Sequence, residues 1–262
     1  GDIYGFIGHN GAGKSTTIRA VVGVLDFSDG EIFIDGHSVK DDPLACKRVT
    51  AYIPDNPDLY ENLPGIQYLN FVADVFGMGA TEREERIARY ADLFEITGAL
   101  GDLIGSYSHG MKQKVAIISA LIHDPKLMVL DEPFVGLDPK ATFALKEVMR
   151  GMCEQGAAVF FSTHVLDVAE KLCNKVAIIR QRKIIAAGTM DELTEGHSLE
   201  ETFLEADHDD ELHVGGWLGF GAHAAADAAP LYQPAQHIPA LQRPEEASSH
   251  RFGLCWCGDY VC

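Results

Sequence analysis

Apolar and polar residues alternate along the chain in a pattern that predicts an α/β fold. Short apolar runs that stop at Gly, Pro or Asp predict buried strands, and apolar residues three or four apart predict helices. The predicted strands are residues 3–7, 31–35, 50–53, 127–130, 157–161, 175–180 and 183–187. The predicted helices are residues 14–23, 108–122, 139–153 and 165–172. Because strands and helices alternate, we expect a mostly parallel sheet flanked by helices, with the last two strands forming a hairpin.

A helical insert interrupts this alternation. From residue 65 to residue 101 apolar side chains such as Leu69 and Ala73 recur at helical spacing, and the pattern resumes after a Gly-rich break. The simplest organisation is one α/β domain over residues 1–206 that contains a helical subdomain at about residues 62–125.

The composition changes near Ala206. Residues 207–262 are rich in Ala, Gly, His and Pro and keep no sustained period, so we expect a disordered tail or a segment that is out of frame. Three cysteines crowd the last residues, and with His250 they could form a zinc site. Reduced thiols of a cytosolic protein are the simpler interpretation of Cys255, Cys257 and Cys262.

Charge and hydropathy restrict the class of partner. The formal net charge of −18 disfavours nonspecific binding to nucleic acid or to anionic lipid, because phosphates would be repelled. No apolar run approaches the ~20 residues that a membrane-spanning helix needs. Residues 1–8 lack the basic start and long apolar stretch of a signal peptide. We therefore expect any contact with a membrane to go through a partner.

A phosphate-binding loop follows the first predicted strand. Residues 8–15, Gly-His-Asn-Gly-Ala-Gly-Lys-Ser, fit G-x-x-x-x-G-K-[ST] and lie between a predicted strand and a predicted helix. The glycines let backbone N–H groups converge on phosphate oxygens, and the helix N-terminus adds partial positive charge. Lys14 would bind the β- and γ-phosphates of ATP, and the Ser15 hydroxyl would bind Mg²⁺. The expected nucleotide-binding residues of this loop are Gly8, Asn10, Gly11, Gly13, Lys14, Ser15 and Thr16.

Two carboxylates end the predicted strand at residues 127–130. Asp131 and Glu132 precede Pro133, and the carboxyl ends of strands are where ligands collect on doubly wound sheets. Asp131 is placed to hold Mg²⁺ through its water shell, and Glu132 to orient and deprotonate the attacking water. Without the phosphate loop, an Asp-Glu-Pro loop opening would be the simpler interpretation.

The segment of residues 106–114, Ser-Tyr-Ser-His-Gly-Met-Lys-Gln-Lys, reveals a family. Alone, Ser108 before a predicted helix would be an N-cap. Together with the phosphate loop and the acidic strand, the segment resembles the signature sequence of ABC ATPases, which are P-loop NTPases. The resemblance runs from about Gly1 to Ala206, with the phosphate loop, signature, acidic strand and a later histidine in the family's order and spacing.

The resemblance implies roles that spacing alone would not. Two such domains pair head to tail, as a homodimer or heterodimer, and bury two ATP molecules between one subunit's phosphate loop and the other's signature. Ser108 and the backbone of Gly110 would donate to the γ-phosphate of the ATP that the partner holds. Asp138 would organise the dimer interface, and His164 would contact the γ-phosphate and the attacking water. Glu132 and His164 are therefore the expected catalytic residues.

Three features depart from the family pattern. His109 and Met111 replace a Gly and a Gln of the commonest signature. Asp55 stands where the family usually has a glutamine that touches Mg²⁺ and senses the membrane partner; a carboxylate can accept from a metal-bound water but cannot donate as an amide can. In the family, a first strand and an aromatic residue that stacks on adenine precede the phosphate loop. This chain begins at Gly1, just before that loop, so it resembles an N-terminally truncated member.

The resemblance also implies the biological setting. Residues 57–69 of the insert look like those of single-domain bacterial subunits paired with ABC-2 type permeases, which more often export than import. We therefore expect an ATPase that powers transport through a separate permease, on the cytoplasmic face of the plasma membrane, with no nucleic-acid partner. The alternative is a soluble ABC-type ATPase acting on ribosomes or DNA. Ribosome-acting members usually carry two ATPase units in one chain, and DNA-repair members carry a long coiled coil, for which no heptads are sustained here.

Overall fold

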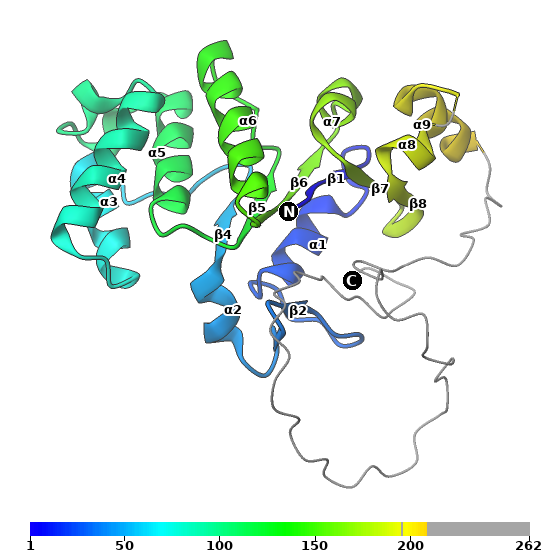
Figure 1. Cartoon of the computed structure of the whole chain (residues 1–262), viewed down its shortest axis with the longest axis horizontal. Helices are drawn as coiled ribbons and strands as arrows, with labels where there is room; N and C mark the ends of the chain where they lie inside the picture. Colours follow the sequence, from blue (N-terminus) through cyan, green and yellow to red (C-terminus); the bar gives the residue numbers. More distant parts are fainter. Residues whose placement is uncertain (195, 209–262) are drawn as a thin grey trace, which may run out of the picture.

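The computed structural model describes residues 1–194 and 196–208 (Figure 1). The expected tail beyond residue 208, including the zinc alternative with His250, lies outside the described residues. Within the described ranges, the helices are too short or too polar to span a bilayer.

A six-stranded sheet forms the centre of the domain, in the order β4-β5-β6-β1-β7-β8. Neighbouring strands are parallel except for β7 and β8, which form the expected antiparallel hairpin. The strands are β1 (Ile3–Ile7), β4 (Thr50–Ile53), β5 (Leu127–Asp131), β6 (Ala158–Thr163), β7 (Lys175–Arg180) and β8 (Lys183–Thr189). The predicted mostly parallel α/β fold is thus confirmed.

Helices cover the sheet, and three of them gather in the insert at one end of the molecule (Figure 1). The insert comprises α3 (Gly65–Val75), α4 (Ala80–Leu93), the short 3₁₀ helices η1 (Thr97–Ala99) and η2 (Ile104–Ser106), and α5 (His109–Leu121). The remaining helices are α1 (Lys14–Val21), α2 (Pro43–Val49), α6 (Pro139–Glu154), α7 (Leu166–Leu172), α8 (Met190–Leu193) and α9 (Leu199–His208).

Strand β5 shows why the sheet needs cover on both faces. All of its residues are buried, and they alternate between two apolar clusters. Met128 and Leu130 belong to the cluster that includes the insert, α6 and α7. Leu127 and Val129 belong to the cluster that includes α1. Leu69 of α3 is fully buried in the first cluster, which ties the insert to the sheet.

Some local features differ from the sequence prediction, which contained neither α8 nor α9. The strand predicted at residues 31–35 is only β2 (Phe33–Ile34), which pairs with β3 (His37–Ser38) in a separate hairpin around a left-handed Asp35. Helix α2 was not predicted because it is only seven residues long. The helix begins with residues that favour helix starts. The Asp42 side chain caps it by accepting from the Ala45 N–H at 3.3 Å, and Pro43 follows at the first helical position.

Candidate functional site

Three neighbouring strands deliver the predicted catalytic residues to one edge of the sheet. Strands β5, β6 and β1 are adjacent and parallel, so their carboxyl ends lie together. In register, Asp131 pairs with Ser162, and Thr163 pairs with Ile7 just before the phosphate loop. The strand order therefore joins three motifs that are far apart in sequence.

The phosphate loop has the backbone geometry that its glycines allow. Gly11 and Gly13 have φ of 82° and 111°, in the region that L side chains rarely adopt. A Cβ on Gly8 would lie 2.4 Å from the Ile179 carbonyl oxygen, so a side chain cannot fit there. Gly13 is also the N-cap of α1 and offers no side chain to cap its N–H groups. The first turn of α1, with Lys14, Ser15 and Thr16, thus keeps N–H groups for an anion.

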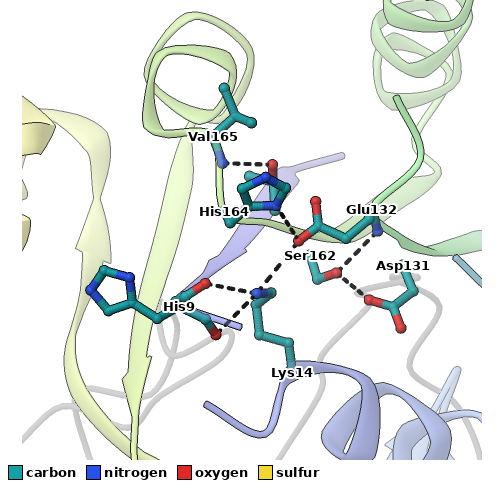
Figure 2. Close-up of polar contacts among 9 residues, drawn as sticks. His9, Lys14, Asp131, Glu132, Ser162, His164 and Val165 are labelled. Carbon is teal, nitrogen blue, oxygen red and sulfur yellow. Dashed lines mark hydrogen bonds and ion pairs between the residues drawn. The ribbon is translucent and has the colours of Figure 1, made fainter. Parts of the chain in front are cut away.

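Lys14 points back across the loop toward the acidic strand end (Figure 2). Its Nζ donates to the carbonyl oxygens of Gly8 at 2.7 Å and His9 at 3.4 Å. It also lies 3.4 Å from Oε1 of Glu132, and only 6% of the Lys14 side chain is exposed. A nearly buried ammonium needs such partners, and all of them are acceptors that a phosphate oxygen could replace.

Glu132 joins the lysine to the histidine. Its Oε1 lies 2.9 Å from Nδ1 of His164, and 16% of the Glu132 side chain is exposed against 46% of the histidine (Figure 2). Glu132 has a left-handed backbone with φ of 49°, held by its N–H, which donates to Oγ of Ser162 at 3.1 Å. A non-glycine residue held at positive φ carries strain that surrounding contacts must offset, as is common at functional sites. Lys14, Glu132 and His164 therefore form one cluster, called here the lysine–glutamate–histidine cluster.

Asp131 is fully buried beside this cluster and keeps one carboxylate oxygen without a hydrogen-bond partner. Its Oδ1 accepts from the hydroxyl of Ser162, whereas Oδ2 is the orphan. A buried, unpartnered carboxylate oxygen fits the water shell of a cation, and carboxylate and hydroxyl oxygens are ligands that Mg²⁺ prefers. The residues present, Asp131 and Ser15 at the start of α1, thus fit Mg²⁺.

Replacing Asp131 tests this fit. We expect Asp131→Asn to keep the acceptor for Ser162 but to lose the negative charge that attracts the cation. Groups that act on a metal through its water shell typically alter metal affinity or activity by about 10- to 100-fold. We therefore expect a rise of that size in the Mg²⁺ concentration for half-maximal ATP hydrolysis, measured by Mg²⁺ titration at fixed ATP. Asp74→Asn, at an aspartate that is 65% exposed on α3, is the control and should match the parent. An unchanged midpoint in Asp131→Asn would contradict the assignment.

The signature residues form a second group. Ser108 caps α5, its Oγ accepting from the Met111 N–H at 3.3 Å. A Cβ on Gly110 would lie 2.7 Å from the Gly136 carbonyl oxygen, so the start of α5 packs closely on the segment after the acidic strand. Asp138 ends that segment and caps α6. Among the described residues, the hydrogen bonds and ion pairs of the Ser108 and Asp138 side chains are with Met111, Lys114 and Ala141, and not with the lysine–glutamate–histidine cluster.

Asp138 also ties α6 to α5. It accepts from the Ala141 N–H at 2.9 Å and lies 2.7 Å from Nζ of Lys114. The hydrogen bond from Lys114, with that from the Ala141 backbone, holds the pKa of Asp138 below its usual range. Asp138 is therefore ionised at neutral pH and joins the signature helix to the helix that follows the acidic strand.

Asp55 lies outside both groups. It is exposed, just beyond β4, and its Oδ1 accepts from the Asn56 N–H at 2.9 Å. Ile53 of β4 pairs with Leu130 of β5, so Asp55 and Asp131 leave the sheet at the same edge. Both carboxylates affect Tyr52 of β4. Burial raises the pKa of Tyr52, and the negative charges of Asp131 and Asp55 also act to raise it. A carboxylate at position 55 thus leaves the sheet at the edge that carries Asp131.

Two parts of the site were missed by sequence reasoning. Ser162 links both carboxylate residues, donating to Asp131 and accepting from the Glu132 N–H. Its position opposite Asp131 depends on the pairing of β5 with β6, which no local pattern reveals. The turn between β7 and β8 supports the loop, since the Arg182 N–H donates to the Ala12 carbonyl oxygen at 2.9 Å. Its two left-handed residues, Gln181 and Arg182, carry no glycine signal in the sequence.

Comparisons with known proteins agree with this geometry. The family model described as ABC transporter matches residues 1–135. The ABC-type transporter ATP-binding protein EcsA of Bacillus subtilis (strain 168) is 38% identical over 216 residues, which are 80% of this chain and 87% of that protein. The linearmycin resistance ATP-binding protein LnrL of the same organism is 33% identical over 193 residues. That match covers 74% of this chain and 62% of LnrL, so the chain spans less than two thirds of that relative.

A solved structure gives the same result. The chain is 37% identical to a structure described as an ATP binding subunit of an ABC transporter, with a TM-score of 0.76. The superposition covers 79% of this chain and 88% of that one.

Proposed function

Because the chain belongs to the ABC transporter family and is one of its ATP-hydrolysing subunits, we propose that its ATPase drives a separate permease that exports a substrate. The observation that carries the proposal is the lysine–glutamate–histidine cluster at the carboxyl edge of the sheet, directly above the phosphate loop (Figure 2). The ATPase domain would comprise residues 1–206, with the helical subdomain at about residues 62–125.

The cluster supplies the parts that hydrolysis needs. Lys14 would leave its carbonyl acceptors to bind the β- and γ-phosphates. Glu132 would take the proton of a water whose oxygen attacks the γ-phosphorus as the bond to the ADP oxygen breaks, giving ADP and phosphate. His164, bonded to Glu132, would orient this carboxylate and contact the γ-phosphate. Ser15 and, through the cation's water shell, Asp131 would hold Mg²⁺, which supplies positive charge to neutralise the phosphates.

The second group would act on the nucleotide of a partner subunit. Ser108 and Gly110 begin α5, where helix N–H groups favour anions. Their separation from the lysine–glutamate–histidine cluster within one chain supports a head-to-tail pair, in which each subunit completes the other's site. Asp138, ionised and fixed by Lys114 at 2.7 Å, would organise the interface. Closing of the pair on ATP and opening after hydrolysis would move the permease.

An exposed aromatic cluster, formed by Tyr60 just before the insert and by two residues of α3, supports docking of the permease. Tyr60 and Phe71 are 58% and 45% exposed, and their ring centroids are 5.7 Å apart. The ring centroids of Tyr60 and Tyr68 are 6.0 Å apart. Tyr68 lies on α3, and Val75 at the end of that helix is 66% exposed. Aromatic residues with apolar neighbours on a surface are typical of protein interfaces. Asp55, which precedes Tyr60 in the chain, would sense the partner in place of the family's usual glutamine.

The direction of transport follows from likeness alone. The insert resembles that of single-domain ATPase subunits paired with ABC-2 type permeases, and the relative LnrL is named for linearmycin resistance. Both support export, and the chain would lie on the cytoplasmic face of the plasma membrane through its permease.

Capture of the partner tests the proposal. The tagged chain should co-purify a polytopic membrane protein from detergent-solubilised membranes, identified by mass spectrometry. Phe71→Asp should abolish capture and leave the chain's own ATP hydrolysis unchanged, because a charge in a buried apolar contact is costly. Leu44→Asp, at a leucine 69% exposed on α2, is the matched control and should capture the permease normally. Co-sedimentation of the chain with ribosomes instead of a permease would contradict the transporter assignment.

A further inference from the structure

Helix α9 reaches the phosphate loop from the far end of the described chain. The ring of Phe203 meets the ring of His9 edge-on, with centroids 4.9 Å apart and planes at 71°. This edge-to-face arrangement is the one that aromatic quadrupoles favour. Phe203 is 8% exposed, whereas its neighbour Leu204 is 51% exposed. Of these two apolar side chains, Phe203 is buried against the loop and Leu204 is exposed to solvent.

The helix that carries Phe203 is anchored independently of the loop. Ser198 and Glu201 cap its start reciprocally: the Ser198 N–H donates to the glutamate at 2.9 Å, and the Glu201 N–H donates to the serine hydroxyl at 3.2 Å. The Thr202 hydroxyl donates to the Leu193 carbonyl oxygen at 2.6 Å, which ties α9 to α8. These bonds hold the start of α9, and so the position of Phe203, without help from the phosphate loop.

The apolar face of α9 packs on α7, the helix that follows His164. Leu199 is fully buried in the same apolar cluster as Ala169 and Leu172 of α7. The turn before α7 is itself braced, since the Val165 N–H donates to the Thr163 hydroxyl at 3.0 Å. Helix α9 therefore touches two segments of the site at once: the phosphate loop, and the helix that begins after the histidine.

His9 contacts both Phe203, through its ring, and the phosphate-binding Lys14, through its carbonyl oxygen. Figure 2 shows its ring directed away from Lys14 while its carbonyl oxygen faces the lysine, at 3.4 Å from Nζ. The same carbonyl accepts from the Ala12 N–H at 3.1 Å, which closes the first turn of the loop. Because the His9 ring and the His9 carbonyl group are attached to the same Cα, a ring held in place by Phe203 restricts the orientation of that carbonyl. The orientation of that carbonyl helps decide where the Lys14 ammonium lies before nucleotide binds.

We propose that Phe203 is a positioning residue of the ATPase reaction, which acts through His9 to hold the phosphate-binding loop in its binding conformation. The inference deepens the proposed function and rests on it in taking Lys14 as the phosphate-binding lysine. Phe203 touches no reacting atom, so its loss should weaken nucleotide binding and leave the chemical step alone.

Steady-state hydrolysis and equilibrium binding of Mg-ATP by the full chain test this inference. An aromatic pair of this kind corresponds to roughly 3- to 10-fold in an equilibrium constant. We expect Phe203→Leu, which keeps apolar burial, to raise KM and Kd for Mg-ATP by that factor with kcat within about twofold of the parent. Phe203→Tyr should restore the parent values, and Leu204→Ala on the same helix should not change them.

A double-mutant cycle separates positioning from packing. If Phe203 acts through His9, His9→Ala alone should weaken binding by a similar factor, and adding Phe203→Leu should weaken it no further. Additive effects, or a parent-like His9→Ala, would overturn the inference, as would a parent KM in Phe203→Leu. His9→Ala leaves α9 intact, so the cycle keeps its meaning even if changes at Phe203 lower stability.

The same titrations distinguish this failure from failure of the proposed function. If the parent binds Mg-ATP and loses that binding on Lys14→Ala while both ring variants match the parent, the inference alone is wrong. If the parent binds no Mg-ATP, the proposed function is wrong and the inference falls with it.

Discussion

Glu132→Gln should reduce the rate of ATP hydrolysis by at least ~100-fold while Mg-ATP affinity stays within a few fold of the parent. The amide has the shape of the carboxylate and can still accept from His164, 2.9 Å away. It cannot take a proton from the attacking water at neutral pH, so the loss falls on kcat. The measurement is Mg-ATP turnover by the full chain, with equilibrium nucleotide binding determined in parallel.

A control with the same backbone geometry exists elsewhere in the chain. Glu95 also has a left-handed backbone, with φ of 54°, and its Oε1 lies 2.9 Å from Nζ of Lys140. It is 58% exposed on the insert. Glu95→Gln removes the same charge from a lysine pair and should leave kcat unchanged. Parent-rate hydrolysis by Glu132→Gln would show that another group, with His164 the first candidate, accepts the proton.

A Glu132→Gln variant that binds ATP without cleaving it also reports on the proposed pairing of two subunits. Each closed pair would trap two nucleotides, because hydrolysis is what reopens it. Addition of Mg-ATP should therefore shift this variant to twice its mass in size-exclusion chromatography. A variant that stays monomeric with bound ATP would contradict the roles proposed for Ser108 and Asp138.

Local sequence patterns predicted much of the fold because the chemistry of its elements is local. Strand β5 is a continuous apolar run buried on both faces, and it ends at the two carboxylates where the pattern predicts. The left-handed conformations of Gly11 and Gly13 are what a glycine-rich phosphate loop requires. Helix α5 begins after Ser108, an N-cap that the sequence displays. In each case a few adjacent residues determine the outcome.

The contacts within the site could not be predicted in the same way. Lys14, Glu132 and His164 meet only because β6 lies between β5 and β1, and strand order depends on how all crossovers pack. The bond from Ser162 to Asp131 depends on the same order. The family resemblance supplied the roles of these residues, but the pairing of Lys14 with Glu132 came from the structure.

The contact between His9 and Phe203 lies furthest from any sequence signal. His9 occupies a variable position of the phosphate-loop motif, and Phe203 lies on a helix that sequence analysis did not predict. The composition changes near this helix, and four of the ten residues of α9 are acidic. Two of its apolar residues are nevertheless buried, Leu199 completely and Phe203 with 8% of its surface exposed, whereas Leu204 is 51% exposed. A short amphipathic helix is held here by tertiary packing, which local propensity does not reveal.

Lys14→Ala should produce the second large effect, a loss of nucleotide binding itself. Hydrogen bonds that involve a charged group contribute about 1.5–3 kcal/mol, so we expect Kd for Mg-ATP to rise by about 10- to 150-fold. The loop would keep its glycines and the N–H groups of α1, which explains why some affinity should remain. Binding is measured by calorimetric titration and by the rise in melting temperature with added Mg-ATP, which depends on ligand concentration relative to Kd.

The structure supplies a matched control for the lysine, because the pair of Lys140 with Glu95 lies outside the site. Lys140 is 79% exposed, whereas Lys14 is 6% exposed, so the two variants compare a solvated ammonium with a nearly buried one. Lys140→Ala should bind Mg-ATP as the parent does. Lys14→Ala also leaves Glu132 without its cation at 3.4 Å, so its melting temperature without nucleotide must be measured too. A folded Lys14→Ala chain with parent affinity would show that the loop backbone alone binds the phosphates, and that the lysine serves only to neutralise Glu132.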